Sequence, residues 1–242
     1  MTPPRKGARP GPPPATDPSF DEELFTFLDD LRANNDKAWF TANRARYERV
    51  VLEPALAFIE DFAPRLETIS HHFRADARAS GGSLFRIHRD TRFAKDKTPY
   101  KTNIGIHFRH NAARDAHAPG FYLHLEPDAC FFGCGIWRPD GPTTQRIREA
   151  IVEDPDGWTG ATRSPAFTGR LELSGDQLKR PPVGFDPAHP LIDDLRRKDF
   201  IALAPVAQSR ACAPELIDDY DELCRLASPL ARFLCRALEL LF

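Results

Sequence analysis

Residues 104–136 read IGIHFRHNAARDAHAPGFYLHLEPDACFFGCGI, and this stretch decides which fold the chain can adopt. It contains three short runs in which hydrophobic residues alternate with polar residues or glycine, each bounded by Pro, Gly, Asn or Asp. Successive side chains of a β-strand point to opposite faces, so a period of two predicts strands with one buried face. Because the runs are close together, we expect them to form an antiparallel meander.

The alternation extends upstream to Phe85 and Ile87, which we expect to begin the meander and to point into the core. The core face would then also carry Ile104, Ile106, Phe108, Leu123 and Leu125. In the last run, Gly133 and Gly135 alternate with Cys and Ile, so their face is bare backbone that something else can approach closely.

Three helices are predicted before the meander, because hydrophobic residues recur at helical intervals over residues 20–66. Ser19 with Glu22 has the spacing of a capping box, Asp36 can cap the second helix, and Pro54 suits the first turn of the third. The N-terminal part of the domain is therefore expected to be helical.

Helical signals return after the meander. Thr143 or Thr144 can cap one helix, residues 200–206 resemble another strand, and residues 214–227 and 229–242 predict two terminal helices. Helices, then antiparallel strands, then helices predict an α+β fold. We expect a central antiparallel β-meander, with an N-terminal helical segment and C-terminal helices packed on one face.

The amino-acid composition indicates the size of the folded domain and the cellular compartment. The 242 residues are 41% hydrophobic, enough for a large core, and we expect one α+β domain over residues 19–242. Residues 1–18 hold seven prolines and predict a disordered tail. The five cysteines form no CxxC pair, and no apolar run approaches the roughly 20 residues of a membrane span, so we expect a cytoplasmic protein without membrane partners.

The candidate functional site is the stretch RIHRDTRFAKDKTPYK, residues 86–101, because forked guanidinium groups and point-charge ammonium groups together suit a bound phosphate or carboxylate. Asp90 is the candidate general base or cation orienter, and Tyr100 the candidate for hydrogen bonding or stacking. The candidate ligand-binding residues are Arg89, Arg92, Lys95, Lys97 and Lys101, with Lys179 and Arg180 reaching in from a second basic loop.

Strand parity also predicts a polar second face of the sheet, made by Arg86, His88, Asp90, Lys101, Asn103, His107, Tyr122, His124 and Glu126. Its histidines could act as acids, bases or metal ligands, but antiparallel sheets commonly have one solvated face. No close-spaced ligand pair such as HExxH occurs, so we predict neither a metal site nor a cofactor.

The stretch RDTRFAKDKTPYK, together with FLDDLRANNDKAWFTANRARYE (residues 27–48), GFYLHLEP (120–127), GCGIW (133–137) and LKRPPVGFD (178–186), resembles the family known as domain of unknown function 2461. The resemblance covers about residues 20–205. It implies a cytoplasmic microbial and fungal domain and carries no activity with it. Pro182 and Val183 depart from the more usual K-R-x-P-R-G-F run, in which an arginine would stand near Val183.

Three hypotheses follow. The first is a binding or enzymatic pocket for a small phosphorylated or carboxylated ligand. The second is a nucleic-acid-binding or interaction module, in which the same cations meet phosphates and Phe93, Tyr100 or Tyr122 stack on bases. The formal charge of −2 disfavours it, because such domains are usually basic. The third is a structural salt-bridge network without a ligand.

Overall fold

The computed structural model describes residues 17–92, 94–112 and 118–242. Within this range the protein has the predicted α+β fold, with one antiparallel sheet of five strands in the order β1-β2-β3-β5-β4. The buried hydrophobic side chains form one connected core. Most of the predicted N-terminal tail, residues 1–16, lies outside the described residues, as does Phe93.

The predicted meander is confirmed in β1 (Ile104–Arg109), β2 (Gly120–Leu125) and β3 (Phe131–Ile136). The later predicted strand is also present, as β5 (Phe200–Pro205), and it pairs with β3. At the far edge lies β4 (Glu172–Ser174), which was not predicted because three residues are too few to show a period.

The prediction that residues 85–87 begin the meander as a strand is wrong, because residues 84–88 form only isolated bridges. Ile87 is buried as expected, but Phe85 lies on the second face of the sheet, with its ring 5.9 Å from the rings of both His107 and Tyr122. A segment without a continuous ladder does not keep strict strand alternation, which is why parity fails at Phe85.

The N-terminal helices begin and end close to the predicted positions. Asp36 caps the second helix by accepting from the Trp39 N–H at 2.9 Å, and Pro54 lies in the first turn of the long one. The first helix is capped by Asp21 rather than by Ser19, because the Asp21 carboxylate accepts from the N–H groups of Glu23 and Leu24. These elements are α1 (Glu22–Ala33), α2 (Lys37–Ala42), α3 (Arg44–Tyr47), the π-helical turn η1 (Glu48–Leu52) and α4 (Glu53–Ile69).

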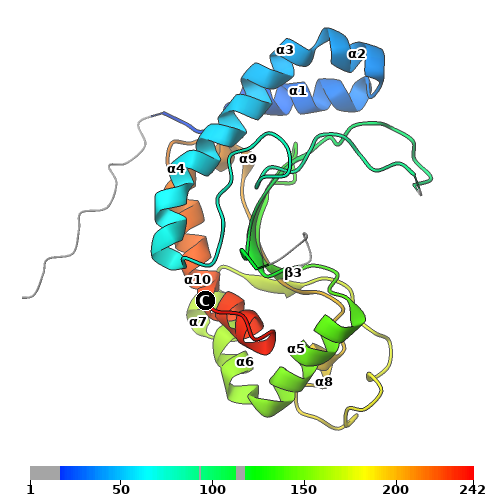
Figure 1. The fold of residues 1–242 in the computed structure, drawn as a ribbon, viewed down its shortest axis with the longest axis vertical. Helices are drawn as coiled ribbons and strands as arrows, with labels where there is room; N and C mark the ends of the chain where they lie inside the picture. The colour runs from blue at the N-terminus through cyan, green and yellow to red at the C-terminus, as the bar shows by residue number, and fades with distance from the viewer. Residues whose placement is uncertain (1–16, 93, 113–117) are drawn as a thin grey trace, which may run out of the picture.

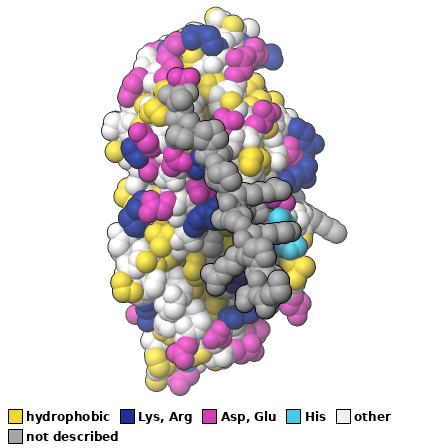
Figure 2. All heavy atoms as spheres, turned by 90° about the vertical axis from the view of Figure 1, so that its left-hand side faces the viewer, with side chains coloured by type: hydrophobic (Ala, Val, Ile, Leu, Met, Phe, Trp, Pro, Cys, Tyr) yellow, Lys and Arg dark blue, Asp and Glu magenta, His cyan; other side chains and the backbone are white. Residues whose placement is uncertain are grey.

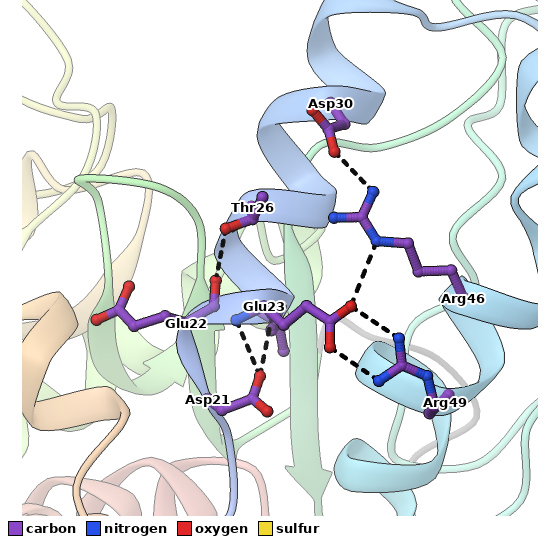
Figure 3. A network of polar contacts seen from close by, with 8 residues as sticks. Asp21, Glu22, Glu23, Thr26, Asp30, Arg46 and Arg49 are labelled. Atoms are coloured by element: carbon purple, nitrogen blue, oxygen red, sulfur yellow. Dashed lines mark hydrogen bonds and ion pairs between the residues drawn. The ribbon is translucent and has the colours of Figure 1, made fainter.

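Ion pairs hold α1 against α3 and η1 (Figure 3). Glu23 accepts two hydrogen bonds from Arg49, at 2.7 and 2.8 Å, and Asp30 accepts one from Arg46 at 2.6 Å. The Arg46 guanidinium also lies 5.5 Å from the Phe27 ring centroid, which joins the ion pairs to the core. Such exposed pairs are individually weak, so the network mainly orients helices that hydrophobic burial stabilises.

The helices after β3 correct two expectations. The helix α5 (Gly141–Glu153) is capped by Asp140, which accepts from the Thr143 N–H at 2.8 Å, rather than by Thr143 or Thr144.

The two predicted terminal helices form one helix, α10 (Leu216–Ala237), with Pro229 inside it. An internal proline costs about 3 kcal/mol, but hydrophobic residues on both sides of Pro229 face the core and their burial outweighs that cost. The short helices are α6 (Pro155–Thr162), α7 (Pro165–Thr168), α8 (Ile192–Leu195) and α9 (Gln208–Ala211).

The helices α4 and α10 cover one face of the sheet, as Figure 1 shows. At their contact the Tyr220 ring of α10 lies 4.8 Å from Phe62 of α4 and packs against Phe108 and Phe132 of the sheet. On the outer surface of this side, basic and acidic side chains are interspersed (Figure 2). In the described part of the chain, no helix is long and apolar enough to cross a membrane.

The second face of the sheet is less bare than its glycines predict. The Tyr122 ring packs over Gly105, where an added Cβ would lie 2.5 Å from the hydroxyl oxygen, and its Cβ and Cδ1 lie beside Gly133. At Gly135 it is the β5 backbone that approaches, because an added Cβ would meet the Phe200 carbonyl oxygen at 2.0 Å. The close approach expected at Gly135 is therefore made by the chain itself.

Gly135→Ala is expected to destabilise the protein by about 3 kcal/mol, because Gly135 has a φ of +126° and its Cβ position is occupied by the Phe200 backbone. Gly160→Ala is the matched control, since this glycine lies inside α6 with nothing near its Cβ position. The control should stabilise by about 0.5–1 kcal/mol through helix propensity. Urea unfolding of both variants measures the difference, and equal effects would contradict the account of β3 and β5.

Candidate functional site

The basic stretch is attached to the N-terminal helices by the Asn35 side chain and by a stacked pair of rings. Between α1 and α2, the Asn35 side chain accepts a hydrogen bond from the Tyr100 N–H and donates one to the Tyr100 carbonyl oxygen, each at 3.0 Å. The Tyr100 ring stacks on Phe40 of α2, with ring centroids 4.1 Å apart, and only 5% of Tyr100 is exposed. Two elements separated by 65 residues are thus held side by side.

A cavity of about 430 Å³ lies where these elements meet. Its lining comes from α1, from the turn that follows it and from the basic stretch, and it includes three cations and one carboxylate. The lining residues are Arg32, Asn35, Arg89, Asp96, Thr98, Tyr100, Lys101, Thr102 and Asn103. Three of the predicted site residues, Arg89, Tyr100 and Lys101, are therefore brought together around one space.

Arg89 is positioned by neighbours within the basic stretch. Its guanidinium donates to the Asp96 carboxylate and to the Thr98 hydroxyl, and the Thr98 hydroxyl in turn donates to Asp96 at 2.9 Å. The hydrogen bond from Arg89, followed by those from Thr98, lowers the pKa of Asp96 to about 2. Asp96 therefore stays ionised at neutral pH and fixes the Arg89 guanidinium at the cavity wall.

Asp90 and Arg92 form a second pair, outside the cavity lining. Two hydrogen bonds from the Arg92 guanidinium, at 2.6 and 3.0 Å, meet the two oxygens of Asp90. The hydrogen bond from Arg92 lowers the pKa of Asp90 to about 2. A carboxylate with so low a pKa is a weak base at neutral pH, which favours the cation-orienting role over the general-base role.

Lys101 differs from the other cations of the stretch. Its side chain is half-buried, and its ammonium nitrogen lies 5.3 Å from the centroid of the Phe85 ring. Within the described residues no carboxylate lies close enough to form an ion pair with it. Burial lowers the pKa of Lys101, and the charge of Arg86 lowers it further. The cavity thus contains a cation whose charged form is disfavoured.

The remaining predicted cations are not gathered at this cavity. Lys97 donates to the Thr91 carbonyl oxygen at 2.9 Å, and the exposed Lys95 is not among the lining residues. Lys179 and Arg180 are exposed in the loop after β4, at the opposite end of the sheet order from β1, and Figure 1 places that loop at the other end of the molecule. The structure does not bring this second basic loop to the first.

Side chains on the second face of β2 form a hydrogen-bonded chain that sequence reasoning missed. The Tyr122 hydroxyl lies 3.0 Å from His124 Nδ1, and His124 Nε2 lies 3.1 Å from Glu126, which also faces Arg32 at 3.6 Å. In the neutral tautomer that satisfies both contacts, Nε2 donates to the carboxylate, which only accepts, and Nδ1 accepts from the Tyr122 hydroxyl. The i, i+2, i+4 spacing placed these residues on one face, but nothing in the sequence indicated their mutual bonds.

His107 lies beside this chain and is buried, contrary to the solvated face expected for it. Burial lowers the pKa of His107 to about 4, and the charge of Arg109 contributes, so the imidazole is neutral at neutral pH. Among residues 17–92, 94–112 and 118–242, no group of three or more His, Cys, Asp or Glu side chains is arranged to hold a metal ion.

Comparison with protein families matches residues 23–233 to the family described as "Conserved hypothetical protein (DUF2461)". The chain belongs to this family. The match includes the whole basic stretch, the α1–α2 turn with Asn35, and all five strands of this DUF2461 protein. A search of curated proteins found no match.

Asn35→Ala is expected to lower the free energy of unfolding by about 2 kcal/mol, because it removes two hydrogen bonds and leaves the backbone of the buried Tyr100 without partners. Asn34→Ala is the neighbouring control: the exposed Asn34 side chain bonds only within its own helix, to the Asp30 carbonyl, and its loss should cost less than about 1 kcal/mol. Chemical denaturation compares the two. A larger effect at Asn34 would refute the role given to Asn35.

The Asp90 and Asp96 carboxyl groups are expected to have a pKa of about 2, below the ordinary aspartate value of 3.8. Because the folded pKa lies below the unfolded one, the arginine pairs stabilise the fold above about pH 4, and this contribution disappears as the pH falls towards 2. Carbon-detected NMR of the side-chain carboxyl groups measures both values. Arg89→Gln should raise the pKa of Asp96 alone, and an equal rise at Asp90 would contradict the separate pairing.

Proposed function

We propose that the cavity lined by Arg32, Arg89 and Lys101 binds a small anion with a carboxylate or phosphate group. The observation that carries this proposal is the half-buried Lys101, which lines the cavity without an ion pair among the described residues. Burying a cation without a partner is costly, and an anion beside it would remove that cost. We therefore infer that the missing partner is supplied by a ligand.

The other two cations can contribute to the same anion. Arg89 is held by Asp96 at the wall, so its planar guanidinium is oriented before a ligand arrives. Arg32 is shared between Asp29, at 3.0 Å, and Glu126, at 3.6 Å. Exposed pairs of this kind contribute about 0–1 kcal/mol, so rearranging them around a ligand costs little.

The size and remaining lining suit a small molecule. Sites for small ligands usually have volumes of about 300–1,000 Å³, and this cavity holds about 430 Å³. Thr102 and Asn103 add a hydroxyl and an amide, which can bond the uncharged part of a ligand. The cavity therefore combines charge for an anionic group with polar groups for specificity.

The structural salt-bridge hypothesis also has support. Arg89 with Asp96, Arg92 with Asp90, and Lys97 with the Thr91 carbonyl all satisfy cations within the basic stretch. These bonds account for much of the stretch without a ligand, but they do not account for Lys101. The anion-site hypothesis therefore predicts that Lys101 contributes to ligand binding, whereas the salt-bridge hypothesis predicts no ligand at Lys101.

A cytoplasmic location is part of the same proposal. The described cysteines, Cys130, Cys134, Cys212, Cys224 and Cys235, are all free thiols. Free thiols are typical of reducing compartments, where small phosphorylated and carboxylated metabolites are also abundant. Fractionation of the native host cell, with detection of the protein, tests this location.

Isothermal titration against 2-oxo acids, sugar phosphates and nucleotides tests the anion site. At least one anion should bind, and Lys101→Ala or Arg89→Ala should weaken its affinity at least tenfold, corresponding to about 1.4 kcal/mol. Lys95→Ala is the matched control, because Lys95 is an exposed cation of the same stretch that does not line the cavity. It should leave the affinity unchanged.

The same titration separates the alternatives. If Lys101→Ala and Arg89→Ala lower only the melting temperature while no anion binds, the stretch has a structural role. If oligonucleotides bind and their affinity falls steeply with salt, with Lys95→Ala as damaging as Lys101→Ala, the cations contact nucleic acid backbone. A small ligand in the cavity should show a much weaker dependence on salt.

A further inference from the structure

Lys101 is placed to react as well as to bind. Its side chain is half-buried at the cavity wall, its amine lies near the face of Phe85, and no carboxylate among the described residues pairs with it. We propose that Lys101 is an amine nucleophile that forms an imine with the carbonyl group of an anionic aldehyde or ketone held in this cavity. This inference rests on the proposed function, because the anionic group would be what holds the ligand there.

The surroundings of Lys101 favour the neutral amine that such chemistry needs. Desolvation by an apolar neighbour and a nearby cation are the two means by which proteins activate lysine. Both act on Lys101, because burial at the cavity wall desolvates its amine and the positive charge of Arg86 acts on it. The charged groups that share the cavity wall are Arg32, Arg89 and Asp96, and Asp96 is bonded to Arg89. Burial and Arg86 together lower the pKa of Lys101.

Two other lysines of the same stretch provide the contrast. Lys97 is exposed and its ammonium is bonded to the Thr91 carbonyl, and Lys95 is exposed and lies outside the cavity lining. A carbonyl compound that reacts with any accessible amine should modify these two at least as readily as Lys101. Selective reaction at Lys101 would therefore reflect its site rather than its accessibility.

The second face of the sheet carries acid–base groups near the cavity, since Glu126 faces the lining residue Arg32 at 3.6 Å. The Phe85 ring contacts both the Lys101 ammonium nitrogen and the Tyr122 ring. The Phe85 and Tyr122 ring centroids are 5.9 Å apart. From Tyr122 the hydrogen-bonded chain continues through His124 to Glu126. Burial raises the pKa of Tyr122, which keeps its hydroxyl protonated and able to donate. A hydroxyl, an imidazole and a carboxylate in this order can pass a proton in either direction.

The reaction needs no further reagent. The Lys101 amine lone pair attacks the carbonyl carbon as the carbon–oxygen π bond breaks, and one proton passes from nitrogen to oxygen to give a neutral carbinolamine. The hydroxyl then takes a proton from solvent and leaves as water while the nitrogen lone pair forms the carbon–nitrogen double bond, and the nitrogen returns its last proton to solvent. The net change is the formation of one carbon–nitrogen double bond and the release of one water molecule. A ligand with both a carbonyl and a carboxylate or phosphate satisfies Lys101 and the arginines together.

Borohydride trapping tests the inference. The full chain is incubated with pyruvate or with glyceraldehyde 3-phosphate, reduced with sodium borohydride, digested and analysed by peptide mass spectrometry. The reduced adduct should appear on Lys101 at least about tenfold above Lys95 and Lys97, since activated lysines react preferentially. Propanal, a carbonyl compound without an anionic group, should show no such preference. Modification of the three lysines to equal extents by the anionic probes would overturn the inference.

Two separate measurements on the wild-type protein distinguish this inference from the proposed function, because titration detects anion binding and trapping detects an adduct at Lys101. Lys101→Arg, which removes the primary amine, should lose the trapped adduct at this position. Anion binding by the wild type without an adduct on Lys101 would overturn the imine and leave the proposed function intact. Absence of both binding and adduct in the wild type would overturn both. The comparison among lysines in the wild type stays decisive if the variant does not fold.

Discussion

Burial of one face of the sheet under α4 and α10 is the constraint on which the rest of the structure depends. Tyr220 of α10 packs against Phe62 of α4 and against Phe108 of the sheet, so helices and strands share one aromatic core. Because side chains alternate along a strand, burying one set forces the other set onto the opposite face. The polar side chains of Tyr122 and His124 in β2, and of Glu126 just after it, lie there because of the same alternation that builds the core.

The Asn35 side chain brings the basic stretch to the α1–α2 turn, and the cavity lies where these two segments meet. This side chain holds the backbone of Tyr100 against the α1–α2 turn, and the stacking of the Tyr100 ring on Phe40 adds a second contact between the basic stretch and the N-terminal helices. The cations of the basic stretch differ in how well their surroundings in the protein stabilise their charge. The exposed ion pairs of the stretch contribute about 0–1 kcal/mol each and can rearrange, whereas Lys101 is a half-buried ammonium with no ion pair among the described residues, and its partial burial is costly. This difference in charge stabilisation distinguishes Lys101 from the ion-paired arginines of the stretch.

The arrangement suits the chemistry of small carbonyl anions better than it suits a nucleic acid. The cations that line the cavity are few and converge on one space, while Lys179 and Arg180 lie at the other end of the sheet and cannot extend a single basic track from it. The side of α4 and α10 shows charges of both signs interspersed (Figure 2). A cluster of cations near a hydrogen-bonded acid–base chain is instead typical of sites where a small ligand is held and reacts.

Local sequence by itself determined the α+β class, the strands β1 to β3 and β5, and the Asp36 cap, because alternation and capping depend on neighbours within a few residues. It also indicated the basic stretch and the residues sharing the second face. Only the tertiary structure decided that α10 continues through Pro229, that Phe85 turns away from the core, and that Lys101 has no carboxylate partner among the described residues, unlike Arg89 and Arg92. Each of these outcomes depends on packing or hydrogen bonding between segments distant in the chain, which no local pattern records.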